Sequence, residues 1–200
     1  NIPNWQEGDH TTTFYRYNPS KNIQKIIFTI PTTKSQNISS VTLSPDQTKI
    51  AYSLHVRTNS DKNGSDNSRQ LWTVNTDGSN NRLISKDKGE GDYVYNDVIW
   101  SPDSQMILFN ANKGNYEIVD VSQNIGNKTR LSLTGLSVEG WFTNNTVGFK
   151  EAKPTGCAEE QECYPSYKIL TANLDGTKKT VHFDSTGDSD PSENNIWLHA

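Results

Sequence analysis

The chain has 200 residues, a formal net charge of −4 and a mean hydropathy of −0.79, and 32% of its residues are hydrophobic. This length suits one large all-β domain or two small domains, and a 10% aromatic content argues against disorder. No run of Lys or Arg exceeds two residues, so nucleic acid and anionic membrane surfaces are not expected partners. No apolar stretch is long enough for membrane insertion.

The first predicted element in chain order is an isolated β-hairpin at residues 12–30. Within it, Lys25–Ile30 is the most apolar segment of the chain, and its length suits a strand. The hairpin precedes the repeated units in the sequence.

The next elements repeat one pattern of strand, turn and strand. Residues 41–52 align without a gap to residues 98–109, and each segment carries Ser-Pro-Asp between two apolar runs. Pro presets φ at the second turn position and Asp can bond its own backbone, so the motif predicts a turn between antiparallel strands. A degraded third copy spans residues 138–149, where Trp141 aligns with Trp100 and an Asn-Asn turn replaces Pro-Asp.

A second hairpin follows each copy. Residues 71–84 alternate apolar and polar side chains on both sides of Asp77-Gly78, which is a strong short-range hairpin signal. Residues 116–131 and 167–181 are its counterparts, and the latter contains Asp175-Gly176.

Four antiparallel strands in about fifty residues form one β-propeller blade. The predicted fold is therefore all-β, with complete blades at about 41–85, 98–133 and 138–184 and a partial blade at 12–30. Residues 194–200 could supply a closing strand. We expect one domain over residues 1–200, either as a closed four-bladed ring or as an arc of a larger propeller. A β-sandwich is the structural alternative.

The unit with Ser44-Pro45-Asp46, Lys49–Tyr52, Leu71–Val74 and Asp77–Ile84 is similar to the WD40-like repeats of TolB-type propellers. The same repeats occur in the propeller domains of prolyl-oligopeptidase-type and tricorn-type peptidases. The resemblance covers residues 12–184 and implies the propeller fold. It also implies an extracytoplasmic protein that binds other proteins, although it transfers no binding residue to this chain.

The sequence shows no catalytic constellation. It lacks a Gly-x-Ser-x-Gly elbow and a His-Glu-x-x-His motif, and no phosphate-binding glycine loop precedes a helical pattern. We therefore expect a non-enzymatic protein with no cofactor. Two acidic segments, 61–67 and 184–193, have oxygen ligands, but their spacing does not complete a calcium loop, so no metal site is predicted.

The two cysteines, Cys157 and Cys163, are separated by five residues. This spacing fits a disulfide across a loop tip, which would form in a periplasmic, cell-surface or secreted setting. Free thiols and half of a metal site are the alternatives.

Two long loops, 55–69 and 151–166, interrupt blades between their second and third strands and so project from the same face. Loops on rigid β scaffolds concentrate binding residues. The candidate binding residues on this loop face are Asp61, Asn63, Asp66, Tyr164 and Tyr167.

The leading hypothesis is a scaffold that binds another protein or a cell-surface component through this loop face. The alternatives are a propeller segment of a larger enzyme, such as a prolyl-oligopeptidase-type peptidase, or a structural module of a cell-surface assembly. The sequence leaves the oligomeric state open.

Overall fold

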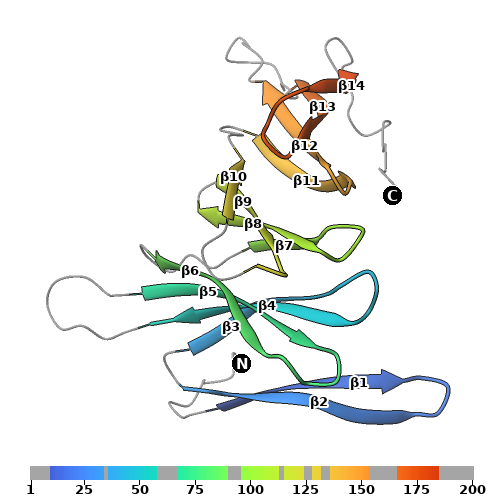
Figure 1. Cartoon of the computed structure of the whole chain (residues 1–200), viewed down its shortest axis with the longest axis vertical. Coiled ribbons are helices and arrows are strands. Elements are labelled where there is room, and N and C mark those ends of the chain that lie inside the picture. Colours follow the sequence, from blue (N-terminus) through green and yellow to red (C-terminus); the bar gives the residue numbers. More distant parts are fainter. Residues whose placement is uncertain are drawn as a thin grey trace, which may run out of the picture.

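The computed structural model describes residues 10–33, 36–57, 67–89, 96–112, 115–123, 128–131, 136–153 and 166–184. All regular structure in these ranges is β, and it forms one two-stranded sheet and three four-stranded antiparallel sheets (Figure 1). The predicted all-β class and its count of three complete units plus one partial unit are therefore confirmed. No helix that could cross a membrane occurs among these residues.

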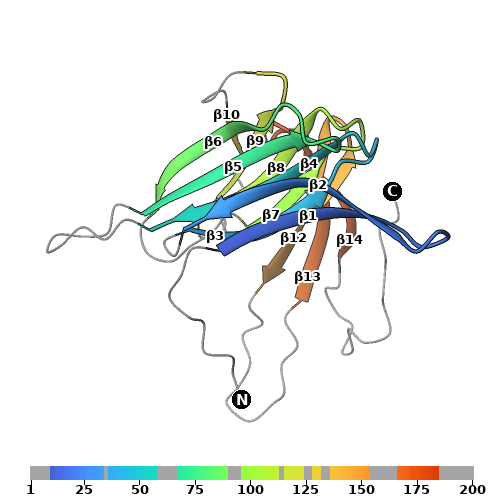
Figure 2. The ribbon, with the colours of Figure 1, turned by 90° about the horizontal axis from the view of Figure 1, so that it is seen from below.

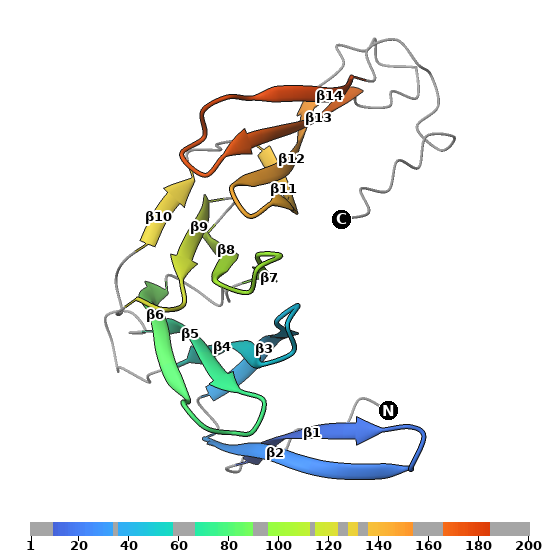
Figure 3. The same cartoon turned by 45° about the vertical axis from the view of Figure 1, so that its right-hand side comes forward.

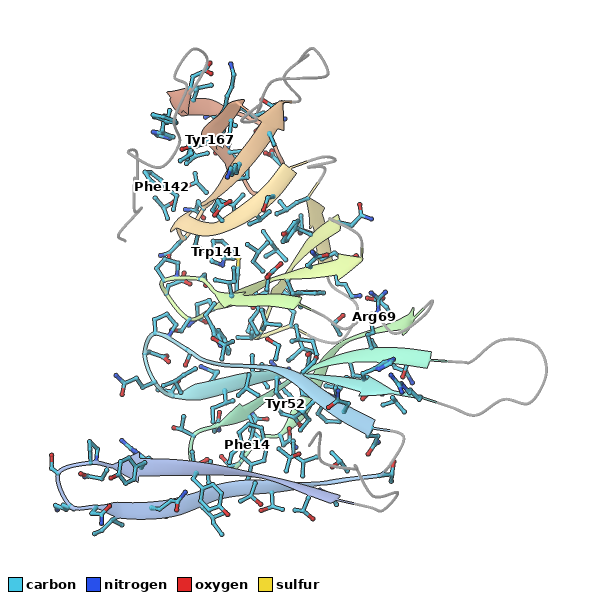
Figure 4. All side chains as sticks on the ribbon, turned by 180° about the vertical axis from the view of Figure 1, so that it is seen from behind. Phe14, Tyr52, Arg69, Trp141, Phe142 and Tyr167 are labelled. Atoms are coloured by element: carbon cyan, nitrogen blue, oxygen red, sulfur yellow. The ribbon has the colours of Figure 1, made fainter. Side chains whose placement is uncertain are left out.

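The N-terminal hairpin consists of β1 (His10–Asn18) and β2 (Ile23–Thr32). Phe14 lies opposite Phe28, and their rings stack at a centroid distance of 4.4 Å. Both rings lie 6.0 Å from the ring of Tyr52 in the next sheet. This aromatic cluster attaches the hairpin to that sheet, as Figure 4 shows for Phe14 and Tyr52.

The three complete sheets share one strand order, in which each strand pairs with the next along the chain. Each sheet thus has the order predicted for a propeller blade. The first contains β3 (Gln36–Leu43), β4 (Lys49–Val56), β5 (Asn67–Asn75) and β6 (Arg82–Gly89). The second contains β7 (Asn96–Trp100), β8 (Met106–Asn112), β9 (Asn115–Asp120) and β10 (Lys128–Leu131). The third contains β11 (Leu136–Thr143), β12 (Thr146–Lys153), β13 (Ser166–Asn173) and β14 (Thr180–Asp184).

The Ser-Pro-Asp segments form the predicted turns between first and second strands. The Ser44 hydroxyl donates to Asp46 Oδ1 at 2.6 Å, and Asp46 Oδ1 also accepts from the Thr48 N–H at 3.0 Å. Ser101 and Asp103 repeat the first bond at 2.6 Å. The side chains of Ser44 and Asp46 therefore stabilise the turn by hydrogen bonds within it.

Hairpins β1–β2, β5–β6 and β13–β14 share an irregularity in their pairing. The register skips one residue of the second strand between Phe14 and Tyr15, between Leu71 and Trp72, and between Ile169 and Leu170. A bulge at the same place identifies β1–β2 as the counterpart of the third and fourth strands of a complete sheet. The hairpin is therefore the outer half of a unit, as predicted.

Neighbouring sheets are joined by two repeated hydrogen bonds. The indole N–H of Trp100 donates to the Thr42 carbonyl at 3.3 Å, and that of Trp141 donates to the Ile99 carbonyl at 3.1 Å. At the turns, the Asp46 N–H donates to Ser104 Oγ at 3.1 Å, and the Asp103 N–H donates to Asn144 Oδ1 at 3.0 Å. The equivalent tryptophans thus serve packing between sheets, as the alignment predicted.

Apolar side chains fill the spaces between the sheets. Ala51 and Leu71 pack with Trp100 and Phe109, while Leu108 and Tyr116 of the middle sheet pack with Phe149 of the last. Through this packing the four sheets follow one another along an arc (Figure 3). Seen from below, hairpin β1–β2 lies across the first complete sheet and its turn projects past the other sheets (Figure 2). The described residues form an open arc rather than a closed ring.

Candidate functional site

Most of the predicted loop-face residues lie outside the described part of the chain. These are Asp61, Asn63, Asp66, Tyr164 and both members of the cysteine pair, Cys157 and Cys163. The predicted disulfide and the segments weighed for calcium are therefore untested. Among the described residues, no group of three His, Cys, Asp or Glu side chains could hold a metal ion.

Tyr167 is the one predicted site residue that the structure describes. It lies on β13 opposite Ala152, with the ammonium group of Lys150 4.5 Å above its ring and the ring of Phe183 at 5.5 Å. A cation over an aromatic face is attractive, so the tyrosine is held against its own sheet. Tyr167 therefore contributes to the outer face of the last sheet (Figure 4).

That outer face carries further aromatic side chains. Phe142 is 43% exposed and its ring lies 5.3 Å from the ring of His182. His182 Nε2 lies 2.8 Å from the Thr171 hydroxyl. The face is partly apolar, and the described residues place no further sheet on it.

A partly buried group of charges lies between the first and second complete sheets. Lys128 Nζ lies 2.7 Å from the Asp87 carboxylate and 3.3 Å from that of Glu117. Arg69, which is 4% exposed, donates to the Ala111 carbonyl across the same interface (Figure 4). Because each of these charges has a partner, we interpret the group as a connection between sheets.

One feature that the sequence analysis did not predict is a groove of about 450 Å³ between β1 and β3. Its lining comprises residues 14–17 of β1, Ile27 of β2, residues 41–43 of β3, and Gln47, Ile50 and Thr76. We call this feature the β1–β3 groove.

The β1–β3 groove exposes large apolar side chains. Val41 and Leu43 are 51% and 50% exposed, and Tyr15 and Tyr17 are 49% and 57% exposed. Arg16 is the one charged residue among the described residues that line it. The groove is therefore an apolar cleft with one cation in its wall.

The carboxylates of Asp46 and Asp77, which are next in sequence to residues that line the groove, accept hydrogen bonds within their own turns. Asp46 precedes Gln47, and the hydrogen bond from the Ser44 hydroxyl together with that from the Thr48 N–H lowers the pKa of Asp46 to about 2. Asp77 follows Thr76, and hydrogen bonds from the Ser79 hydroxyl and N–H lower its pKa as well. Both groups stay ionised near neutral pH and hold their turns.

No protein-family model matches the chain, and no curated protein matches it. Solved structures do match. The β-propeller domain of the trilobed protease from Pyrococcus furiosus, described as having an open velcro topology, gives a TM-score of 0.54 at 16% identity. The match covers 86% of this chain and 49% of that one.

The AtxE2 isopeptidase, solved with Astexin3-dC4 bound, also gives a TM-score of 0.54, at 14% identity over 74% of this chain and 30% of that one. The sheets are propeller blades. This chain thus spans about half of the first matched chain and under a third of the second. A structure described as TolB from Agrobacterium tumefaciens matches with a TM-score of only 0.32, at 10% identity over 88% of this chain and 89% of that one.

Two signals in the sequence could have located the groove. Leu43 occupies the position that Trp100 occupies in the second complete blade, so β3 has no indole to bond a preceding inner strand. Residues 10–33 also contain three Lys or Arg residues and no Asp or Glu, in a chain of net charge −4. The first signal marks β3 of the first complete blade and the second marks the N-terminal hairpin, and these are the two sides of the groove.

Proposed function

We propose that this chain is a non-enzymatic, TolB-like β-propeller module that binds another protein, or a protein component of a cell surface. The observation that carries the proposal is the β1–β3 groove, where four large apolar or aromatic side chains are about half exposed. Exposed apolar patches with a polar rim mark sites of protein interaction. Aromatic anchors such as Tyr15 and Tyr17 dominate the energetics of such interfaces.

The proposal includes an extracytoplasmic location. Its support is the spacing of Cys157 and Cys163 and the resemblance of the repeats to TolB-type propellers. Intact mass under non-reducing conditions, before and after alkylation, tests the disulfide. Alkylation of both thiols without a reductant would contradict the extracytoplasmic part of the proposal.

Site-specific photocrosslinking tests the binding proposal. A benzophenone amino acid at Leu43 should give one discrete adduct in an extract of the source cells, and the same group at the exposed Lys86 on β6 serves as the control position. The adduct protein, identified and purified, should then bind the unmodified chain saturably. Absence of a Leu43-specific adduct, or turnover of a peptide or glycan by the purified chain, would overturn the proposal.

The second candidate is the propeller segment of a larger peptidase. Its support is that the protease propeller and the isopeptidase are the matched structures with a TM-score of 0.54, and that this chain spans 49% and 30% of them. The parent reading frame discriminates between the candidates. A flanking α/β domain with Gly-x-Ser-x-Gly would favour the peptidase segment, because that motif places a nucleophilic serine.

A further inference from the structure

One polar row crosses the first complete blade on the face that meets the second blade. The pairing register places its four members opposite one another on the successive strands β3 to β6: Asn37, His55, Arg69 and Asp87. Residues directly opposite each other in an antiparallel pair share one face of the sheet. Arg69 donates to the Ala111 carbonyl (Figure 4), and Lys128 Nζ donates to the Asp87 carboxylate, so the whole row faces the second blade. We call the interface between these two blades the first seam.

Two cations and two anions balance one another in the first seam at neutral pH. Lys128 Nζ lies 2.7 Å from Asp87 Oδ2 and 3.3 Å from Glu117 Oε2. Arg69 supplies the second cation and is 4% exposed, while Glu117 is 6% exposed. Because water is largely excluded from these two side chains, a change in the charge balance acts at a low dielectric constant.

His55 is the member of the row whose charge changes near neutral pH. A histidine side chain ordinarily gains its proton between about pH 7 and pH 5, and a carboxylate gains its proton below about pH 5. His55 is 3% exposed and lies directly opposite Arg69, which places their Cβ atoms about 5 Å apart. A proton on His55 therefore puts a second cation beside a buried one, which is unfavourable.

The two carboxylates of the first seam do not offset this added charge. Asp87 lies one strand beyond Arg69 in the row, so it is farther from His55 than the guanidinium-bearing residue is. Its carboxylate and that of Glu117 already contact Lys128. The cation is thus the nearest charged neighbour of His55 within its row.

The remaining ionisable residues of the surrounding strands leave the same balance. On β7, the Asp97 carboxylate accepts a hydrogen bond from the hydroxyl of Tyr116, and the ring of Tyr116 packs against the third blade. Arg57, two positions after His55, is exposed, and β10 carries a further cationic residue at Arg130. These residues add positive charge rather than negative charge on the side of the first seam.

The interface between the second and third blades, the second seam, provides an internal control. Its core is apolar, with Leu108 of the second blade packed with Phe149 of the third. The third blade also has an ion pair, in which Lys168 Nζ lies 2.6 Å from Asp184. This pair joins the neighbouring strands β13 and β14, so neutralising it breaks no contact between blades.

We propose that the first seam is an acid-sensitive junction, at which protonation of His55 and then of Asp87 and Glu117 separates the first blade from the second. Once these three groups carry their protons, the seam holds three cations and both of its carboxylates are neutral. Opening the seam gives the cations access to water. Acid thereby detaches the N-terminal hairpin and the first blade from the rest of the arc, while the second seam stays closed.

Amide hydrogen exchange on the full 200-residue chain tests the junction. Each rate is expressed as a protection factor, which removes the pH dependence of the chemical exchange step. Between pH 7 and pH 5 the protection factors of β4 and β5 should fall about five-fold or more, while those of β12 and β13 stay constant. His55→Gln should abolish this fall. His182→Gln is the matched control, because His182 lies on β14 of the third blade, and it should leave the fall unchanged.

Neutral amides reproduce the protonated carboxylates without acid. The double variant Asp87→Asn/Glu117→Gln should lower the protection factors of β4 and β5 about ten-fold at pH 7, because hydrogen bonds to charged groups are replaced by weaker neutral ones. Asp184→Asn neutralises the ion pair within the third blade and should leave β4 and β5 unchanged.

The wild-type chain alone is enough to refute the inference. Constant protection of β4 and β5 between pH 7 and pH 5, or an equal fall in β12 and β13, would overturn it. An undiminished fall in His55→Gln would also overturn it. Full protection of β4 and β5 at pH 7 in the double amide variant would overturn the part assigned to the two carboxylates.

Discussion

Gly78 is one of the residues through which the first complete blade touches the N-terminal hairpin. Its φ is +88°, and a Cβ added there would lie 2.6 Å from the Ile27 carbonyl oxygen and 3.4 Å from Phe28 Cβ. Gly78→Ala therefore has two effects. The left-handed backbone costs about 1–2 kcal/mol with a Cβ present, and the contact forces the backbone of β2 away from its blade.

Gly176 is a matched control. It stands in the same Asp-Gly turn with a φ of +80°, and its N–H donates to the Asn173 carbonyl at 2.8 Å, as that of Gly78 does to Asn75. It belongs to the last blade, at the end of the arc opposite the hairpin (Figure 1). Gly176→Ala should show only the backbone effect.

We expect Gly78→Ala to lower the free energy of unfolding by about 1–3 kcal/mol more than Gly176→Ala does, which is the usual range for an overpacked contact. Urea unfolding followed by near-ultraviolet circular dichroism measures the difference, because the Phe14, Phe28 and Tyr52 rings sit at the affected contact. Equal losses in the two variants would refute the assignment of Gly78 as a point of contact.

Three further predictions concern the connections between and within blades. Lys128→Met should destabilise the chain by about 2 kcal/mol in urea unfolding, because it removes the cation from a partly buried charge group, and adding Glu117→Leu should recover much of that loss. The folded-state pKa of Asp46 is about 2, below its ordinary 3.8, so its stabilising contribution is present above pH 4 and is lost as pH falls toward 2. The unfolding midpoints of the wild-type chain and Asp46→Asn should therefore converge over that range. Trp141→Phe should cost about 1 kcal/mol more than Trp72→Phe in urea unfolding, because it removes a bond between blades, whereas the Trp72 indole donates within β5 to Gln70.

Each of these predictions has an outcome that contradicts it. A double variant no more stable than Lys128→Met would mean that Glu117 does not depend on Lys128. A constant difference in unfolding midpoint between the wild-type chain and Asp46→Asn from pH 4 to pH 2 would show that protonation of Asp46 does not contribute to the loss of stability in acid. Equal losses of unfolding free energy for Trp141→Phe and Trp72→Phe would show that the Ile99 carbonyl accepts a hydrogen bond from another donor in the variant.

The blade architecture was predictable because its signals are local. Ser-Pro-Asp and Asp-Gly specify turns over a few residues, and Trp141 aligned with Trp100 even where the turn had degraded to Asn-Asn. Each of these features depends on neighbours along the chain, which is the information that a sequence carries directly.

The groove and the partly buried charges were not predicted. The sequence holds two signals for the groove, but neither of them shows which strands lie beside each other. Lys128 of the second blade contacts Asp87 of the first, 41 residues away in the sequence, and no spacing along the chain predicts that contact. Tyr167 looked like a loop residue, yet its ring packs under Lys150 on the face of its sheet.

The bonds between blades make this molecule a one-dimensional lattice. Strand β7 contacts β3 on one side and β11 on the other, so the middle blade is buttressed twice. In such a lattice the stability of each unit depends on its immediate neighbours. The terminal units should therefore unfold before the middle blade.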